Sequence, residues 1–87
     1  LNIINISIKL PITLSVDSKN YNLSQKLEKK LYELDLVSSY HIDNYNNEKI
    51  IYKIIYNSTP DKFINEFANS NIKLNTSKSV WSIEWQT

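Results

Sequence analysis

The chain offers few side chains whose type and spacing could carry out chemistry. Its single histidine, His41, lies beside Ser39 and Asp43 on the polar phase of an alternating segment, and a metal or acid–base site there would need partner groups that the spacing does not supply. The acids Asp35, Asp43, Glu48 and Glu84 show no helical pairing that would bring two carboxylates together for general acid–base catalysis. We therefore predict a protein that is not an enzyme and has no catalytic, cofactor-binding or metal-binding residues.

Composition excludes several further classes of site. The 87 residues include no Cys, Gly, Met or Arg, so the chain can form neither a disulfide framework nor a thiolate metal site. RNA-recognition folds rely on arginine and glycine, and acylphosphatase-like enzymes need an arginine for phosphate. The formal net charge of +1 gives no strong attraction to a polyanion. Ile, Asn, Ser, Lys and Tyr supply 52 of the residues, a bias that we interpret as the codon usage of an AT-rich bacterial genome.

The elements that would position any site follow from the order of hydrophobic periods along the chain. In order, the predicted elements are a strand over 12–16, a helix over 21–34, strands over 37–44 and 49–57, a helix that begins at Pro60, and a strand over 80–86. This βαββαβ order in a short chain predicts a ferredoxin-like α+β sandwich. We expect a four-stranded antiparallel sheet in the order 4-1-3-2, with both helices on one face.

Lys53 decides which face of the predicted sheet meets the helices. On its strand, Tyr52 and Ile54 share one phase and Lys53 occupies the other, and an ammonium group is costly to bury. The Tyr52 face should therefore form the core, together with Trp81 and Ile83 of the last strand. If these aromatic rings lay on an uncovered face instead, they could stack the bases of single-stranded RNA.

The N-terminal segment alternates for longer than one strand of the sheet needs. Four apolar residues share one phase there, namely Ile4, Ile6, Ile8 and Leu10. Because Pro11 cannot donate a ladder hydrogen bond, we expect an N-terminal β arm or tether over residues 1–11 and a single domain over residues 12–87. An apolar edge of this kind either completes the domain's own sheet or tethers a neighbouring domain, or it pairs with a protein partner or with a second copy. The absent initiator Met indicates a fragment of a longer precursor.

These observations predict a non-catalytic interaction or structural module of a larger protein. The alternative is a module that reads RNA or a cell-wall glycan on the open face of the sheet. Its candidate contact residues are Thr13, Ser15, His41, Lys53 and Glu84. A third hypothesis is a small-molecule regulatory domain of the amino-acid-sensing kind, but such domains usually carry Gly after the first strand, where this chain has DSKNYN.

The preferred interpretation involves no cofactor and no nucleic acid. It also involves no membrane insertion, because no apolar run approaches the roughly 20 residues that cross a bilayer. The N-terminus lacks a basic region followed by an apolar stretch of the kind that begins a signal peptide. We therefore expect any partner to be a protein that binds the N-terminal arm.

Several segments show a family resemblance. They are ITLSV, LSQKLEKKLYEL, VSSYHI, KIIYKIIY, PDKFINEFA and IKLNTSKSVWSIEW. Together they resemble the C-terminal domain of an uncharacterised proteobacterial envelope family that carries a domain of unknown function. The resemblance implies a ferredoxin-like fold and a signal-bearing, non-enzymatic protein of the periplasm or cell envelope. It carries over no functional residues.

Overall fold

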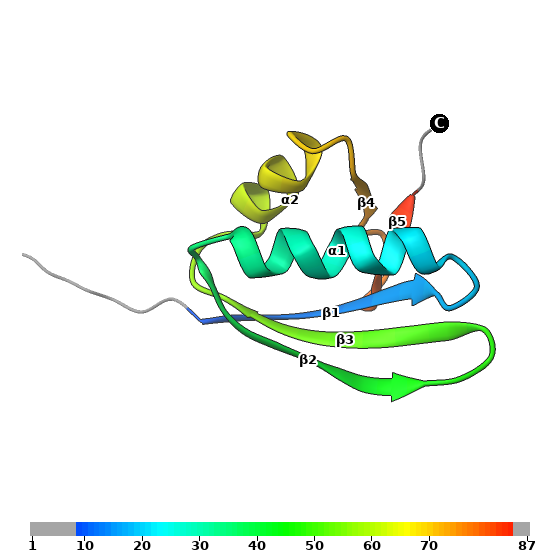
Figure 1. Ribbon diagram of the computed structural model, residues 1–87. Coiled ribbons are helices and arrows are strands. Elements are labelled where there is room, and N and C mark those ends of the chain that lie inside the picture. The colour runs from blue at the N-terminus through cyan, green and yellow to red at the C-terminus, as the bar shows by residue number, and fades with distance from the viewer. Residues whose placement is uncertain (1–8, 85–87) are drawn as a thin grey trace, which may run out of the picture.

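Two helices and five strands make up the part of the chain that the computed structural model describes, residues 9–84. In chain order these are β1 (Leu10–Asp17), α1 (Tyr21–Glu33), β2 (Val37–Tyr45), β3 (Lys49–Tyr56), α2 (Pro60–Ala68), β4 (Lys73–Asn75) and β5 (Trp81–Glu84). Figure 1 shows one sheet with both helices on the same side. The α+β class predicted from the sequence is therefore confirmed.

The sheet has five strands in the order β2-β3-β1-β5-β4 and is mixed rather than antiparallel. β3 runs antiparallel to β2 and β1, whereas β5 runs parallel to β1 and antiparallel to β4. The predicted four-stranded antiparallel sheet is therefore wrong. The difference arises at residues 73–75, which form a strand of their own, β4. Because the β4–β5 hairpin adds one more reversal of the chain, the strand beside β1 runs in the same direction as β1.

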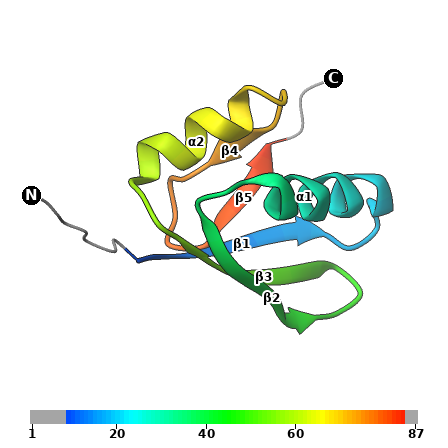
Figure 2. The same cartoon turned by 60° about the vertical axis from the view of Figure 1, so that its left-hand side comes forward.

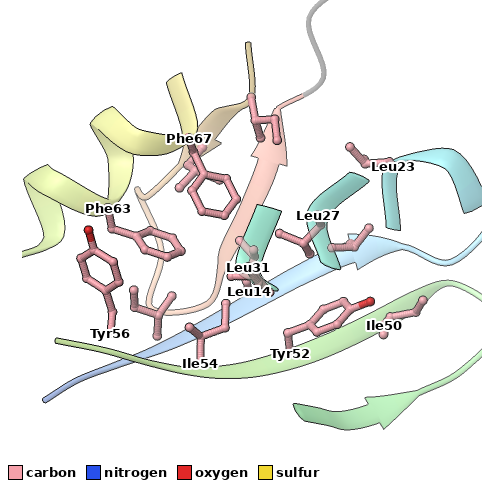
Figure 3. Packing of buried hydrophobic residues seen from close by; sticks show 14 residues of the cluster. Leu14, Leu23, Leu27, Leu31, Ile50, Tyr52, Ile54, Tyr56, Phe63 and Phe67 are labelled. Atoms are coloured by element: carbon pink, nitrogen blue, oxygen red, sulfur yellow. The ribbon is translucent and has the colours of Figure 1, made fainter. Parts of the chain in front are cut away.

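One face of the sheet carries the core. The β3 residues on this face are all buried, namely Ile50, Tyr52, Ile54 and Tyr56. They belong to one apolar cluster with Leu27 of α1 and Phe63 of α2 (Figure 3). Lys53 is exposed on the opposite face, as predicted from the cost of burying its ammonium. Trp81 is half-buried on the core side, with its ring centroid 6.1 Å from that of Phe63.

Side-chain caps fix where the two helices begin. At the start of α1, Asn20 Oδ1 accepts a hydrogen bond of 3.0 Å from the backbone N–H of Leu23. At the start of α2, Thr59 Oγ1 accepts one of 3.3 Å from the backbone N–H of Lys62. Pro60 occupies the first position of α2, where its missing N–H removes no intrahelical bond. The predicted helix start at Pro60 is confirmed.

Asn71 ends the α2 segment and directs the chain into β4. Its φ of 61° lies in the left-handed region, which Gly adopts freely and Asn tolerates better than most residues. The N–H of Asn71 donates to the carbonyl of Ala68 at 2.9 Å, and that of Ile72 donates to Phe67 at 3.0 Å. This pair of bonds is a Schellman motif. Ile72 and Phe67 both belong to the buried core, so the motif is anchored by apolar packing.

We expect two substitutions of Asn71 to have different effects on stability. Asn71→Ala keeps a Cβ in the left-handed region and should lower the free energy of unfolding by about 1 kcal/mol. Asn71→Gly removes the Cβ and should leave it unchanged within about 0.5 kcal/mol. Urea denaturation followed by circular dichroism measures both. An equal loss in the two variants would contradict the assigned role of the turn.

Candidate functional site

β2 forms one edge of the sheet, and β3 is the strand that pairs with it. Its register against β3 shifts between Val37 and Ser39 and again between Ile42 and Asn44, so bulges interrupt the ladder at both places. Between them, residues 39–42 pair regularly with β3. We call these residues the edge segment. Their outer side faces no other strand in the described part of the chain, so its backbone N–H and C=O groups are available for pairing.

The edge segment also exposes apolar surface on the helix side of the sheet. Tyr40 and Ile42 lie opposite Ile54 and Tyr52 of β3, so their side chains share the face that carries the core. Tyr40 is half-buried, whereas Ile42 is 49% exposed and Tyr45, farther along the strand, is 68% exposed. Figure 1 shows that β2 runs outside β3, at the margin of the sheet. The surface beside the edge segment is therefore apolar and accessible.

Tyr52 holds α1 in place beside this edge. Its hydroxyl donates to Glu28 Oε2 at 2.5 Å. It also lies 3.0 Å from Ser24 Oγ, which donates to it because the proton of Tyr52 is already used. Burial, with the hydrogen bond to Glu28 as the second cause, raises the pKa of Tyr52 to about 12. The tyrosine therefore stays neutral and keeps donating to Glu28 at neutral pH.

Two more tyrosines lie on the flank of α1 that carries Glu28. Tyr32 follows Glu28 by one helical turn and Tyr21 precedes it by two turns, so both lie on the flank of α1 that carries Glu28. Both side chains are exposed, and the hydroxyl of Tyr21 accepts a hydrogen bond of 2.9 Å from Gln25 Nε2. Neither tyrosine was predicted from the sequence as a surface contact. Their exposure could have been predicted, because neither tyrosine belongs to the row of leucines on α1 that faces the core.

The open face of the sheet holds the residues of the alternative prediction. Lys53 Nζ donates to Thr13 Oγ1 at 3.1 Å, and His41 lies opposite Lys53 on β2, so these three form one row across β1, β3 and β2. Glu84 lies apart on β5, where it forms an ion pair of 3.4 Å with a lysine of β4. Ser15 is nearly buried beside β5. The structure thus brings three of the five residues together and separates the other two.

The predicted pairing arm is described only in part. Ile4, Ile6 and Ile8 lie outside the described residues. Leu10 and Pro11 lie in β1, where they pair with the last residues of β3, so the strand begins before the predicted domain boundary. β5 pairs with β1 only farther along the strand. Within the described residues, β1 therefore has no neighbour on that side at Pro11, and proline can be accommodated there without the loss of a ladder bond.

Within residues 9–84, no three side chains of His, Cys, Asp or Glu gather as potential metal ligands. Neither α1 nor α2 is long and apolar enough to pass through a lipid bilayer. Comparisons with models of protein families, with curated proteins and with solved structures found no match to this chain. The family resemblance noted from the sequence therefore stays a prediction, and a functional proposal has to rest on the geometry.

We expect Tyr52→Phe to destabilise the protein although it removes only one oxygen atom. The substitution leaves the buried Ser24 hydroxyl without its acceptor and the half-buried Glu28 without its donor, which should lower the free energy of unfolding by about 1–3 kcal/mol. Adding Ser24→Ala should cost little more, because its partner is already gone. Urea denaturation of both single variants and the double variant tests this, and additive losses would show that the two hydroxyls act independently.

The same tyrosine gives the stability a dependence on alkaline pH. Because the pKa of Tyr52 is raised from 10.0 to about 12 in the folded protein, its contribution is complete below pH 10 and is lost as pH rises toward 12. We expect the free energy of unfolding to fall by up to about 1.4 kcal/mol per pH unit for such a tyrosine. Urea denaturation between pH 9 and 12 should show a shallower fall for Tyr52→Phe than for the native chain. Equal slopes would mean that Tyr52 ionises alike in both states.

Proposed function

We propose that this protein is a non-catalytic interaction module and that the edge segment of β2 receives an added strand. The observation that supports this most directly is the unpaired outer side of residues 39–42 next to the half-exposed Ile42. Strand addition gains affinity from main-chain hydrogen bonds and specificity from alternate side chains. An added strand would meet Tyr40 and Ile42 on one side and Ser39 and His41 on the other.

The occupant that we propose is the N-terminal arm of a second copy of this chain. An added strand here needs apolar residues in one phase, toward Tyr40 and Ile42, and polar residues in the other. The arm has that pattern, because Ile4, Ile6 and Ile8 alternate with polar residues. The arm therefore has apolar and polar residues in the same alternation as the edge segment.

The position of β1 favours a second copy over the arm of the same chain. The arm precedes Leu10 at the start of β1, and β3 and β2 both lie between β1 and the outer side of β2. Strands lie about 4.8 Å apart, so the arm of the same chain would have to travel about 14 Å sideways. It would also have to reverse direction to run along β2. A second copy faces neither requirement, and the exchange of identical arms closes a symmetric dimer.

A rival proposal, a module that reads RNA or a cell-wall glycan on the open face, has less support. The row of Thr13, Lys53 and His41 supplies polar contacts there. The described strand residues on that face include no Phe, Tyr or Trp, whereas binding of single-stranded nucleic acid and of sugars draws much of its affinity from stacking on such rings. The aromatic residues of β3 point into the core instead.

Sedimentation velocity of the 87-residue chain over a range of concentrations tests the proposed dimer. We expect the native chain to dimerise and two variants to remain monomeric, one lacking residues 1–8 and one carrying Ile42→Lys, which places a charge in the edge segment. Val80→Lys is the matched control, because Val80 is exposed to a similar degree, 42% against 49%, but precedes β5. Circular dichroism verifies that each variant is folded.

The possible results distinguish the role of the arm in dimerisation from that of the edge segment. A monomeric native chain at every concentration would overturn self-association through the arm. A dimer that persists in Ile42→Lys but is lost without residues 1–8 would show that the arm pairs somewhere other than at the edge segment. Loss of the dimer in Val80→Lys as well would mean that added charge anywhere on the surface is sufficient.

A further inference from the structure

β1 and β5 separate at their carboxyl ends and open a depression in the surface. They run parallel but pair only at Leu14 with Trp81 and at Ser15 with Ser82, although β1 continues to Asp17. Figure 2 shows β5 turning away from β1 beyond this point. The depression has a volume of about 440 Å³, within the range of small-molecule sites. We call it the carboxyl-end depression. It lies apart from the edge segment.

Two serine hydroxyls line this depression without partners. Ser15 and Ser82 face each other across β1 and β5. Ser15 is only 9% exposed and Ser82 is half-buried, and neither hydroxyl has a hydrogen-bond partner within the described residues. Within residues 9–84 the fully buried side-chain polar atom without a partner is Asn57 Oδ1, so the Ser15 hydroxyl keeps some accessible surface in the depression and can bond to a group that enters it. The pair is therefore ready to bind a polar group that enters the depression.

Charges of both signs surround the two serines. Lys19 and Lys49 supply two ammonium groups, and Asp17 and Glu48 supply two carboxylates. All four side chains are exposed, and no ion pair joins them to one another, since the salt bridge found within residues 9–84 lies elsewhere, between β4 and β5. Asp17 Oδ1 accepts a hydrogen bond of 2.9 Å from the backbone N–H of Lys19, which fixes its orientation.

This mixture of charges is unfavourable for a ligand that carries only positive or only negative charge. A phosphate would meet two carboxylates and a simple cation would meet two lysines, so each would be repelled by half of the surrounding charges. A molecule with both an ammonium and a carboxylate group can pair each of its charges with one of the opposite sign. We infer that the carboxyl-end depression binds a small zwitterion, such as a free amino acid or a dipeptide. Its carboxylate pairs with a lysine of the depression, and its ammonium pairs with one of the carboxylates, which lie close to the lysines because Asp17 is opposite Lys49.

Titration of the 87-residue chain with alanyl-alanine, followed by amide chemical shifts in NMR, tests the inference. We expect saturable shifts at Ser15, Lys19, Lys49 and Ser82. Acetyl-alanyl-alanine lacks the ammonium and alanyl-alanine amide lacks the carboxylate, so each should bind at least about threefold more weakly than the zwitterion, as loss of an exposed charge pair predicts. Absence of saturation, or equal binding of the blocked dipeptides, would overturn the proposed ligand class.

Substitutions locate the binding. Lys49→Gln and Asp17→Asn remove one charge of each sign and should weaken binding about threefold, and Ser15→Ala should weaken it further by removing the buried hydroxyl. Lys53→Gln, on the same face but outside the depression, is the control and should bind like the native chain. An unchanged affinity in the first three variants would show that the zwitterion binds elsewhere. The edge-segment dimer plays no part in this test, since Ile42→Lys should bind alanyl-alanine normally.

Discussion

Both helices are tied to the sheet by tyrosines of one strand, β3. Tyr52 donates to Glu28 of α1, and Tyr56 donates to Glu66 of α2, while both rings are buried. Burial raises the pKa of Tyr56 above its usual value, and Glu66 raises it further. Each hydroxyl crosses the apolar layer to reach a helix carboxylate, so the polar groups are satisfied at the margin of the core. The same strand must then present Lys53 to water, which fixes its register.

The sequence was sufficient wherever the period or the chemistry was strong. The cost of burying Lys53 predicted the buried face correctly, and Pro60 predicted the start of α2. It was not sufficient for β4, because three residues are too few to show an alternation. The predicted direction of β5 was wrong as a result, because it depends on whether β4 precedes β5 as a separate strand. Nothing in the local pattern around Pro11 showed that it pairs with β3, since this depends on which strands lie on either side.

The candidate surfaces were harder to predict than the fold. Tyr21, Tyr32 and Ile42 are exposed on α1 and β2, and no spacing in the sequence predicts how these two elements lie relative to each other. The carboxyl-end depression likewise combines residues from β1, from β5 and from the turn before β3. Of its residues, only Ser15 was predicted from the sequence as a surface contact. A site that combines residues of several strands can be predicted only when the order and direction of the strands are known. The sequence did not predict these correctly for the whole sheet.

The two bulges in β2 have a consequence for how copies of this chain can assemble. The regular ladder runs only from Ser39 to Ile42 before the register shifts, so a guest strand finds matched hydrogen-bond spacing over a few residues and then loses it. Long flat edges let one chain template the next without limit. Here the interruption on each side limits the matched ladder to residues 39–42, so β2 lacks the long flat edge on which fibril-like templating depends.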